Sequence, residues 1–200
     1  MNDAFELPFP QYRCPECGKD LPLGEARMTV TCASHNQSEP VEFRVRKATD
    51  TDHNEIALLC ERALGETDVD VFGRTFDVFA GVNFLAEVDG ALVGLLALAI
   101  DRGELAVVLL SVYPDFQGKR VGSSLLTAAD EFAAKRGLSF MRVAVTNDDI
   151  PQLYFYQRHG FSIYEAAVGE IADRFGSATP GFSGIPVRDE IRLRRAVCGA

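Results

Sequence analysis

Apolar residues that alternate with polar ones, or that run together, predict a sheet of short strands. Such stretches are found at 41–46, 84–88, 91–100, 105–112, 138–145 and 184–193. Asp89 and Gly90 separate two of these stretches and give a strong hairpin signal. Residues 101–104 supply a second turn, so the middle of the chain is expected to form an antiparallel meander.

Other segments place apolar residues at helical spacing, with start and stop signals at their ends. A first helix is expected between the capping residues 49–52 and Gly65. A second ends at residues 135–137, where two cations and a glycine follow one another, and a third spans 149–160. Residues 69–79 have a weaker pattern that predicts a helix or a lid.

Composition excludes some classes of protein. The 200 residues are 47% hydrophobic, enough for the core of one ordinary domain plus a small module. A net charge of −9 argues against a general nucleic-acid or anionic-membrane surface. No run of about 18 apolar residues is present, so no transmembrane helix is expected. Residues 1–6 are acidic and lack the apolar region of a signal peptide, which predicts a cytoplasmic protein with reduced thiols.

Four residues near the amino terminus have the spacing of zinc ligands. The pattern is Cys-x2-Cys, fourteen residues, then Cys-x2-His, and its members are Cys14, Cys17, Cys32 and His35. Two such pairs present four ligands tetrahedrally and leave no open position, so the segment resembles a zinc ribbon around a structural Zn²⁺. A module this small has too little core to fold alone, so the metal would supply most of its folding free energy.

Alternatives to the zinc ribbon involve the same cysteines. Cys32 could join the first pair in a three-ligand or redox arrangement, whereas a thioredoxin-like motif lacks the βαβ context that it needs. The polar stretch 36–40 ends in proline and marks a domain boundary, which gives a zinc-ribbon-like module at 1–41 and a main domain at 42–200. Cys60 lies in a helical pattern and is expected to be a small core residue.

The stretch 109–126 has the pattern of an anion-binding site. A predicted strand ends at Val112, a loop with glycines and cations follows, and a helix begins. The free N–H groups and the positive end of the helix dipole would point at one spot. Gly118 and Gly122 allow close approach of the backbone to a ligand, while Lys119 and Arg120 add positive charge. An ordinary turn with solvated cations is the alternative.

Two motifs in the main domain resemble those of the GNAT family of N-acetyltransferases. The stretch 117–122 resembles the family's acetyl-CoA pyrophosphate loop, Gln/Arg-x-x-Gly-x-Gly/Ala, with Arg120 in place of the middle glycine. It contains neither a P-loop sequence nor GxGxxG. The stretch 147–161 resembles the second motif, Asn-x5-Leu-x-Phe-Tyr-x3-Gly-Phe, almost position for position. The resemblance covers residues 42–200 and implies an α/β (α+β) GNAT fold, a mixed and mostly antiparallel sheet with flanking helices, preceded by the zinc ribbon.

The resemblance also implies an activity, direct transfer of an acetyl group from acetyl-CoA to a primary amine of a small molecule or protein. It implies that strand amides hold the pantetheine arm and the thioester, and that loop amides hold the pyrophosphate. The residues expected to bind acetyl-CoA are Leu110, Ser111, Val112, Gln117, Gly118, Lys119, Arg120, Val121, Gly122, Ser123 and Asp149. Tyr156 would be the general acid, since a phenol stays protonated at pH 7 and can protonate the departing thiolate. Tyr154 is the neighbouring alternative.

The general base stays open at this point. An alkyl amine has a pKa of about 10.4, so it must lose a proton before it can attack the thioester. Glu104, Glu87 and a water relay are the candidates, because Ala106 and Arg142 occupy positions where some family members carry a strand glutamate. His159 is expected to be a surface cation at the end of a helix.

An alternative function is a CoA-binding regulatory or docking protein that uses the zinc ribbon as an interaction module. The missing strand glutamate favours this alternative, whereas Tyr156 and the pyrophosphate loop favour the enzyme. Acceptor recognition is expected in segments 69–81 and 169–186, and the negative net charge favours a cationic acceptor. No membrane or nucleic-acid partner is expected, and the closing strand could pair across a homodimer.

Overall fold

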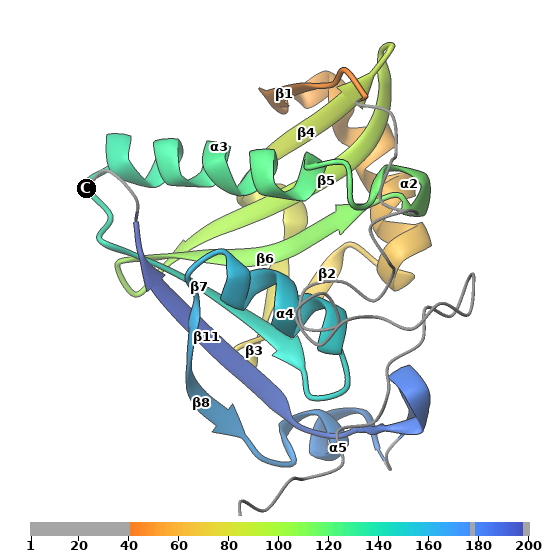
Figure 1. The fold of residues 1–200 in the computed structure, drawn as a ribbon, viewed down its shortest axis with the longest axis vertical. Helices are drawn as coiled ribbons and strands as arrows, with labels where there is room; N and C mark the ends of the chain where they lie inside the picture. Colours follow the sequence, from red (N-terminus) through yellow and green to blue (C-terminus); the bar gives the residue numbers. More distant parts are fainter. Residues whose placement is uncertain (1–40, 177–178, 198–200) are drawn as a thin grey trace, which may run out of the picture. The chain divides into compact units, whose positions relative to one another are not determined.

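The predicted strands assemble into one seven-stranded sheet (Figure 1). The computed structural model describes residues 41–176 and 179–197. In order across the sheet, the strands are β1 (Arg44–Lys47), β4 (Val82–Val88), β5 (Ala91–Asp101), β6 (Glu104–Val112), β7 (Phe140–Thr146), β11 (Glu190–Ala196) and β8 (Ser162–Ala167). All neighbours are antiparallel except β6 and β7, which are parallel. The expected mixed, mostly antiparallel sheet is therefore confirmed.

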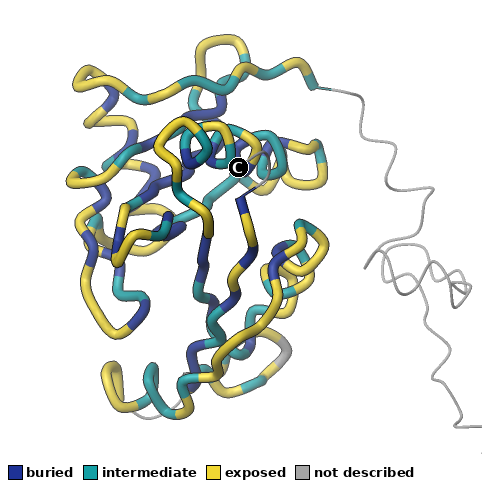
Figure 2. The backbone as a smooth tube through the Cα atoms, turned by 90° about the vertical axis from the view of Figure 1, so that its left-hand side faces the viewer, coloured by how far each residue is buried: buried dark blue, intermediate teal, exposed yellow. Residues whose placement is uncertain are grey.

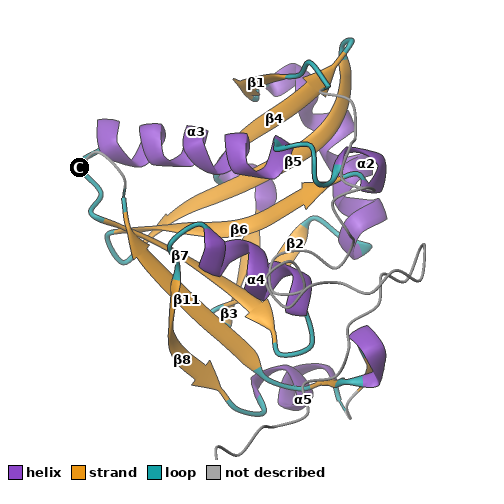
Figure 3. Ribbon diagram, in the orientation of Figure 1, coloured by secondary structure: helices purple, strands orange, loops and turns teal. Residues whose placement is uncertain are grey.

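Helices cover both faces of this sheet (Figure 3). Helices α3 (Val121–Lys135) and α4 (Ile150–Arg158) pack on one face, and α2 (His53–Leu64) packs on the other. The short elements are η1 (Asp50–Asp52), β2 (Asp68–Val71), β3 (Arg74–Asp77), η2 (Val78–Ala80), η3 (Pro114–Phe116), α5 (Glu170–Phe175), β9 (Thr179–Pro180), η4 (Phe182–Gly184) and β10 (Pro186–Val187). Helix α2 ends as predicted at Gly65, which has a φ of 83°. No helix among these is long and apolar enough to cross a bilayer.

The core has two parts, one on each face of the sheet. Strand β5 contributes to both, because Leu95 packs against α2 and Leu96 packs against α3, and each is fully buried. Burial on both faces explains why this strand is apolar without interruption. Cys60 is a core residue as expected, and burial raises the pKa of its thiol. Figure 2 shows buried stretches inside the domain and exposed residues at its outer turns.

The helix expected at residues 69–79 is wrong, because they form a β-hairpin and a 3-10 turn, whereas their role as a lid stays a prediction. Strands β2 and β3 pair from Asp68 opposite Asp77 to Val71 opposite Arg74. The turn between them has positive φ at both central residues, 57° at Phe72 and 70° at Gly73, as a two-residue hairpin of this hand requires. A phenylalanine is costly in that conformation, and this obscured the turn signal in the sequence.

The carboxyl-terminal part contains elements that the sequence did not predict, namely β8 and α5. Among the strands of the described residues, β8 lies at the sheet edge and pairs with β11 alone, and its Ile163 and Tyr164 are 51% and 47% exposed. The pairing of β8 with β11 shifts register between Arg192 and Leu193. The closing strand expected at 184–193 overlaps β11 only at 190–193, and β11 is paired on both sides, with β7 and with β8. β11 therefore has no open edge with which to pair across a homodimer, and a homodimer stays a prediction.

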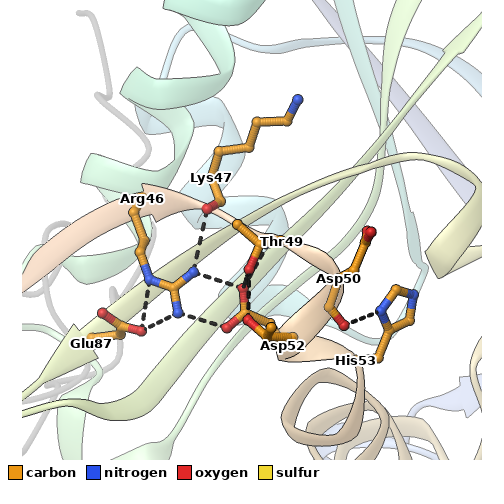
Figure 4. A network of polar contacts seen from close by, with 8 residues as sticks. Arg46, Lys47, Thr49, Asp50, Asp52, His53 and Glu87 are labelled. Carbon is orange, nitrogen blue, oxygen red and sulfur yellow. Dashed lines mark hydrogen bonds and ion pairs between the residues drawn. The ribbon is translucent and has the colours of Figure 1, made fainter.

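An arginine joins the first strand to the start of α2 (Figure 4). The guanidinium of Arg46 donates to both carboxylate oxygens of Asp52 at 2.7 Å and reaches Glu87 of β4 at 2.5 Å. Asp52 also accepts the backbone N–H of Thr49 at 2.7 Å, which caps the turn before the helix. Arg46, and after it the Thr49 N–H, hold the pKa of Asp52 well below its usual range. The network fixes where α2 begins.

We expect Asp52→Asn to lower the free energy of unfolding by about 2 kcal/mol at pH 7, because Arg46 loses a charged, mostly buried partner. The folded-state pKa of Asp52 is depressed, so this contribution is complete above about pH 4 and is lost as the pH falls through the folded-state pKa. Urea unfolding at pH 7, 5 and 3 measures the difference. Asp50→Asn, at an exposed neighbouring carboxylate, is the control; equal losses in both variants would contradict the prediction.

Candidate active site

Strands β6 and β7 diverge towards their carboxyl ends (Figure 1). They pair only over residues 105–107 and 141–143. The β5–β6 pairing shifts register at residues 97–98, which marks a bulge where the divergence begins. Beyond it, residues 110–112 of β6 have no strand partner on the β7 side among the described residues. Open backbone donors and acceptors of this kind can bind the amide groups of an extended ligand.

The loop after β6 is tied to the end of that strand by Gln117. Nε2 of its side-chain amide donates a hydrogen bond to the backbone carbonyl oxygen of Val112 at 2.9 Å. Gly118 has a φ of 74°, and a Cβ atom there would meet nothing within 4 Å. Glycine at this position is therefore required by backbone conformation, and the space beside it is open.

The first turn of α3 presents unpaired amides. Ser124 donates to the carbonyl of Arg120 at 3.0 Å, so within the described chain the N–H groups of Val121, Gly122 and Ser123 point out of the helix end. Together with the helix dipole, such groups favour an anion. The predicted strand, loop and helix start are all confirmed as elements.

Arg120 stands where the family's pyrophosphate-loop motif has its middle glycine. The backbone conformation at this position shows why glycine is favoured there. The residue precedes α3 with a φ of 68°. An L-residue with a Cβ atom costs of order 1 kcal/mol in this conformation. The chain thus keeps a strained, exposed arginine beside the free amides, where its positive charge adds to theirs.

Gly122 also has a packing role that the sequence did not suggest. A Cβ atom on Gly122 would lie 3.2 Å from Cζ of Phe155 on α4. The missing side chain therefore allows α3 and α4 to pack closely, and the aromatic ring fills the space next to the loop. Close packing here fixes the position of α4 relative to the free amides of α3.

His159 is not the simple surface cation that was expected. Its Nδ1 lies 2.7 Å from the carbonyl oxygen of Phe155, and its Nε2 lies 2.9 Å from Oγ of Ser123. The imidazole is partly buried and its ring is tilted on Phe155, with centroids 4.3 Å apart. The i, i+4 spacing of Phe155 and His159 was the available sequence signal, but no sequence pattern shows that α3 lies opposite.

Tyr156 lies on α4, and its side chain is buried in the core. It is 1% exposed, and its ring makes edge-on contacts with Phe155 and Phe161 at centroid distances of 5.3 and 5.4 Å. Burial, and then the negative charge of Asp149, raise the pKa of its phenol above the usual value. The hydroxyl therefore stays protonated across the physiological range. Tyr154 lies on the other side of α4 and is 39% exposed.

The turn after β7 holds the loop that follows α5. Oδ1 of Asn147 accepts the N–H groups of Arg188 and Asp189, each at 2.9 Å. Asp148 accepts the N–H of Phe182 at 2.9 Å. Burial would raise the pKa of Asp148, but hydrogen bonds from Thr146 and Phe182 outweigh it and hold the pKa below its usual value. Asp149 caps α4 by accepting the N–H of Gln152 at 3.0 Å, as predicted.

Both carboxylates named as candidate bases are already bound to arginines. Glu87 accepts two hydrogen bonds from Arg46, and Glu104 accepts one from Arg194 at 3.2 Å. Glu104 begins β6, at the far end of the strand from the diverging edge. Each of these carboxylates therefore already has an arginine as its hydrogen-bond donor.

Ala106 and Arg142 lie directly opposite each other where β6 and β7 still pair. Arg142 is buried and forms an ion pair with Asp101. Its guanidinium also stacks on the ring of Phe72 at 4.1 Å. The hairpin tip is fixed further by Glu190, which accepts the N–H of Phe72 at 2.9 Å. A cation held by packing and charge thus takes the place of a strand carboxylate.

No group of three or more His, Cys, Asp or Glu side chains that could hold a metal ion occurs within residues 41–176 and 179–197. The predicted zinc ligands, Cys14, Cys17, Cys32 and His35, lie outside the described residues. The ribbon therefore stays a prediction from the sequence.

The sequence of the main domain matches the model of a known protein family. Residues 49–161 match the model of the acetyltransferase (GNAT) family. The chain belongs to this family. The match begins at the cap of η1 and ends just after α4, so it includes the diverging strands, the loop and Tyr156.

The curated relatives share only part of their length with the chain. A mycothiol acetyltransferase from Clavibacter sepedonicus is 34% identical over 97 residues, which cover 48% of this chain and 32% of the relative. The chain thus spans about a third of that protein's length.

Solved structures share the fold over most of the chain. An acetyltransferase from Bacillus subtilis in complex with CoA has a TM-score of 0.61 and 22% identity, over 78% of this chain and 99% of that one. A GNAT family acetyltransferase from Elizabethkingia anophelis with acetyl-CoA bound has a TM-score of 0.61 and 18% identity, over 80% and 99%. At these identities the likeness shows the fold.

Proposed function

We propose that the protein is an acetyl-CoA-dependent N-acetyltransferase that transfers the acetyl group directly to a primary amine of a small molecule or protein. The observation that carries the proposal is the open edge of β6 leading into the free amides of α3, within a chain of the GNAT family. Family members of the same fold hold CoA or acetyl-CoA.

The residues present fit such a co-substrate. Leu110, Ser111 and Val112 offer backbone groups to the pantetheine arm and the thioester. The loop Gln117–Ser123 offers amides and two cations to the pyrophosphate, with Gln117 acting through its hold on Val112. Asp149 orders the start of α4 next to this site.

Tyr156 is the proposed general acid. Transfer forms the amide bond, breaks the carbon–sulfur bond and leaves a thiolate that needs a proton. A phenol of ordinary pKa, about 10, is already protonated at pH 7 and can supply that proton. Burial raises the pKa of Tyr156 further, which keeps the hydroxyl protonated but makes it a weaker acid until acetyl-CoA binds beside it. The ion pairs of Glu87 and Glu104 favour a water relay for removing the proton of the amine.

A catalytically weak CoA-binding or docking protein is the second candidate. It is favoured by Ala106 and the buried Arg142, which occupy the strand positions where the resemblance to the family leads us to expect a glutamate. In this case acetyl-CoA would bind without turnover, so binding and turnover have to be measured separately.

The first test is calorimetric titration of acetyl-CoA into wild type, Arg120→Glu and Arg102→Glu. Arg102 is a matched control, because it is also exposed and has a positive φ of 53°, but lies in the β5–β6 turn. We expect the affinity to fall about tenfold or more in Arg120→Glu only, since a carboxylate would face the pyrophosphate. Absence of binding in wild type, or an equal loss in both variants, would contradict the proposed site.

We expect Tyr156→Phe to lower kcat about a hundredfold with little change in acetyl-CoA affinity, because only the proton donor is lost. Turnover is followed as free thiol release with an amine chosen from a panel of small amines and amino-terminal peptides. Tyr154→Phe, at the exposed neighbour, should keep its kcat within about twofold. An unchanged kcat in Tyr156→Phe would assign the proton to Tyr154 or to solvent.

We further propose that Cys14, Cys17, Cys32 and His35 hold one structural Zn²⁺ in a module at residues 1–41. The purified full chain should contain about one zinc per molecule, and Cys14→Ser should lose most of it. Cys198→Ser is the control, because that cysteine is isolated in the sequence. Full zinc content in the Cys14→Ser protein would rule out the site.

A further inference from the structure

A chain of two hydrogen bonds connects α4 to the first turn of α3. It runs from the carbonyl oxygen of Phe155 to Nδ1 of His159 at 2.7 Å, and from Nε2 of His159 to Oγ of Ser123 at 2.9 Å. Ser123 is the third residue of α3, and its amide is one of those proposed to bind the pyrophosphate. The imidazole of His159 is thus connected to the proposed pyrophosphate site by the hydroxyl of Ser123.

The partners of the imidazole determine its tautomer. A carbonyl oxygen only accepts hydrogen bonds, so Nδ1 must carry a hydrogen to bind Phe155. In the neutral ring Nε2 is then an acceptor, and the bond at 2.9 Å takes the hydroxyl hydrogen of Ser123. The oxygen of Ser123 is left with only lone pairs towards the loop, which is unfavourable next to a phosphate.

Protonation of the ring reverses the second bond. In the imidazolium both nitrogens carry hydrogen, so Nε2 donates to the oxygen of Ser123. The hydroxyl hydrogen of Ser123 is then released and can be donated to an anion at the helix end. The added proton also places a positive charge one residue away from the proposed pyrophosphate site.

We propose that His159 is a positioning residue that couples binding of acetyl-CoA to uptake of one proton, by turning the hydroxyl of Ser123 towards the pyrophosphate. The inference rests on the proposed function, because it requires the loop to bind acetyl-CoA. The coupling runs through Ser123 on α3 and His159 at the end of α4. Because binding takes up a proton, the affinity for acetyl-CoA should be higher at lower pH.

The charged groups near His159 interact with partners other than the imidazole. On α3 the neighbouring charges are Arg120, one turn before Ser123, and Asp130, which pairs with Arg195 of β11 at 2.7 Å. On α4 the adjacent Arg158 donates to the hydroxyl of Tyr154 at 3.2 Å. Among the described residues, His159 takes part in no ion pair, so no carboxylate there fixes its charge before an anion binds.

The test measures affinity against pH with a ligand that does not itself titrate. The 3′-phosphate of CoA is a monoester whose second ionisation falls near pH 6, so the probe is the acetyl thioester of 3′-dephospho-CoA. Calorimetry at pH 6, 7 and 8, in two buffers of different ionisation enthalpy, gives both the affinity and the number of protons taken up. In wild type we expect affinity to fall about fivefold or more from pH 6 to pH 8, with proton uptake on binding.

Two variants break the coupling at different atoms. In His159→Gln the ring that takes up the proton is missing, and in Ser123→Ala the hydroxyl that transmits the change is missing. Both should reduce the pH dependence to less than about twofold. Arg158→Gln is the matched control, since it removes a cation from the same end of α4 without contacting Ser123, and should retain the full pH dependence.

Proton NMR of the imidazoles gives a readout that a purely structural role would not change. The chain has three histidines, and the His159 signal is the one missing in His159→Gln. Its titration midpoint should move to higher pH when the dephospho thioester binds to wild type, but not to Ser123→Ala. The same spectra show whether each variant is folded.

The outcomes separate this inference from the proposed function. Binding to wild type without proton uptake, or an unchanged pH dependence in His159→Gln, would overturn the role of His159 and leave the acetyl-CoA site standing. If neither acetyl-CoA nor the dephospho thioester binds at any pH, the proposed function fails and the inference fails with it.

Discussion

The end of backbone pairing between β6 and β7 is the constraint on which the rest of the site depends. Parallel pairing ends at Val107, because the bulge in the neighbouring ladder turns β6 away. Where a strand separates from its neighbour inside a domain, its backbone N–H and C=O groups need other hydrogen-bond partners. In the proposed function these groups come from the co-substrate, so the sheet is completed only in the complex.

Helices α3 and α4, next to this edge, are held together by contacts at two small residues of α3. Gly122 allows the ring of Phe155 to approach α3, and Ser123 binds His159 one residue further along. A Cβ atom at position 122 would lie 3.2 Å from Cζ of Phe155, so the ring or its helix would have to shift by a few tenths of an ångström next to the Ser123–His159 bond. Packing and hydrogen bonding at this junction are therefore not independent, and Tyr156 is positioned by the same contacts.

The elements around the site could be predicted from the sequence, since their signals are local. Hydrophobic periodicity, the caps at Gly65 and Asp149 and the turn at Asp89 and Gly90 each depend on neighbouring residues. The hairpin at Phe72 was missed because its turn residue is unfavourable in isolation and is stabilised by Arg142 and Glu190 from distant strands. Contacts between α3 and α4 were missed for the same reason, since no local pattern specifies them.

The register shift beside β8 bears on what this protein does at high concentration. An edge strand with exposed Ile163 and Tyr164 is a template on which further strands could add, chain after chain, into a fibre. The irregular ladder between Arg192 and Leu193 distorts that template, and Glu165, paired with Arg192 at 2.9 Å, places charge on it. An irregular, charged edge is a poorer template for the addition of further strands than a regular, apolar one.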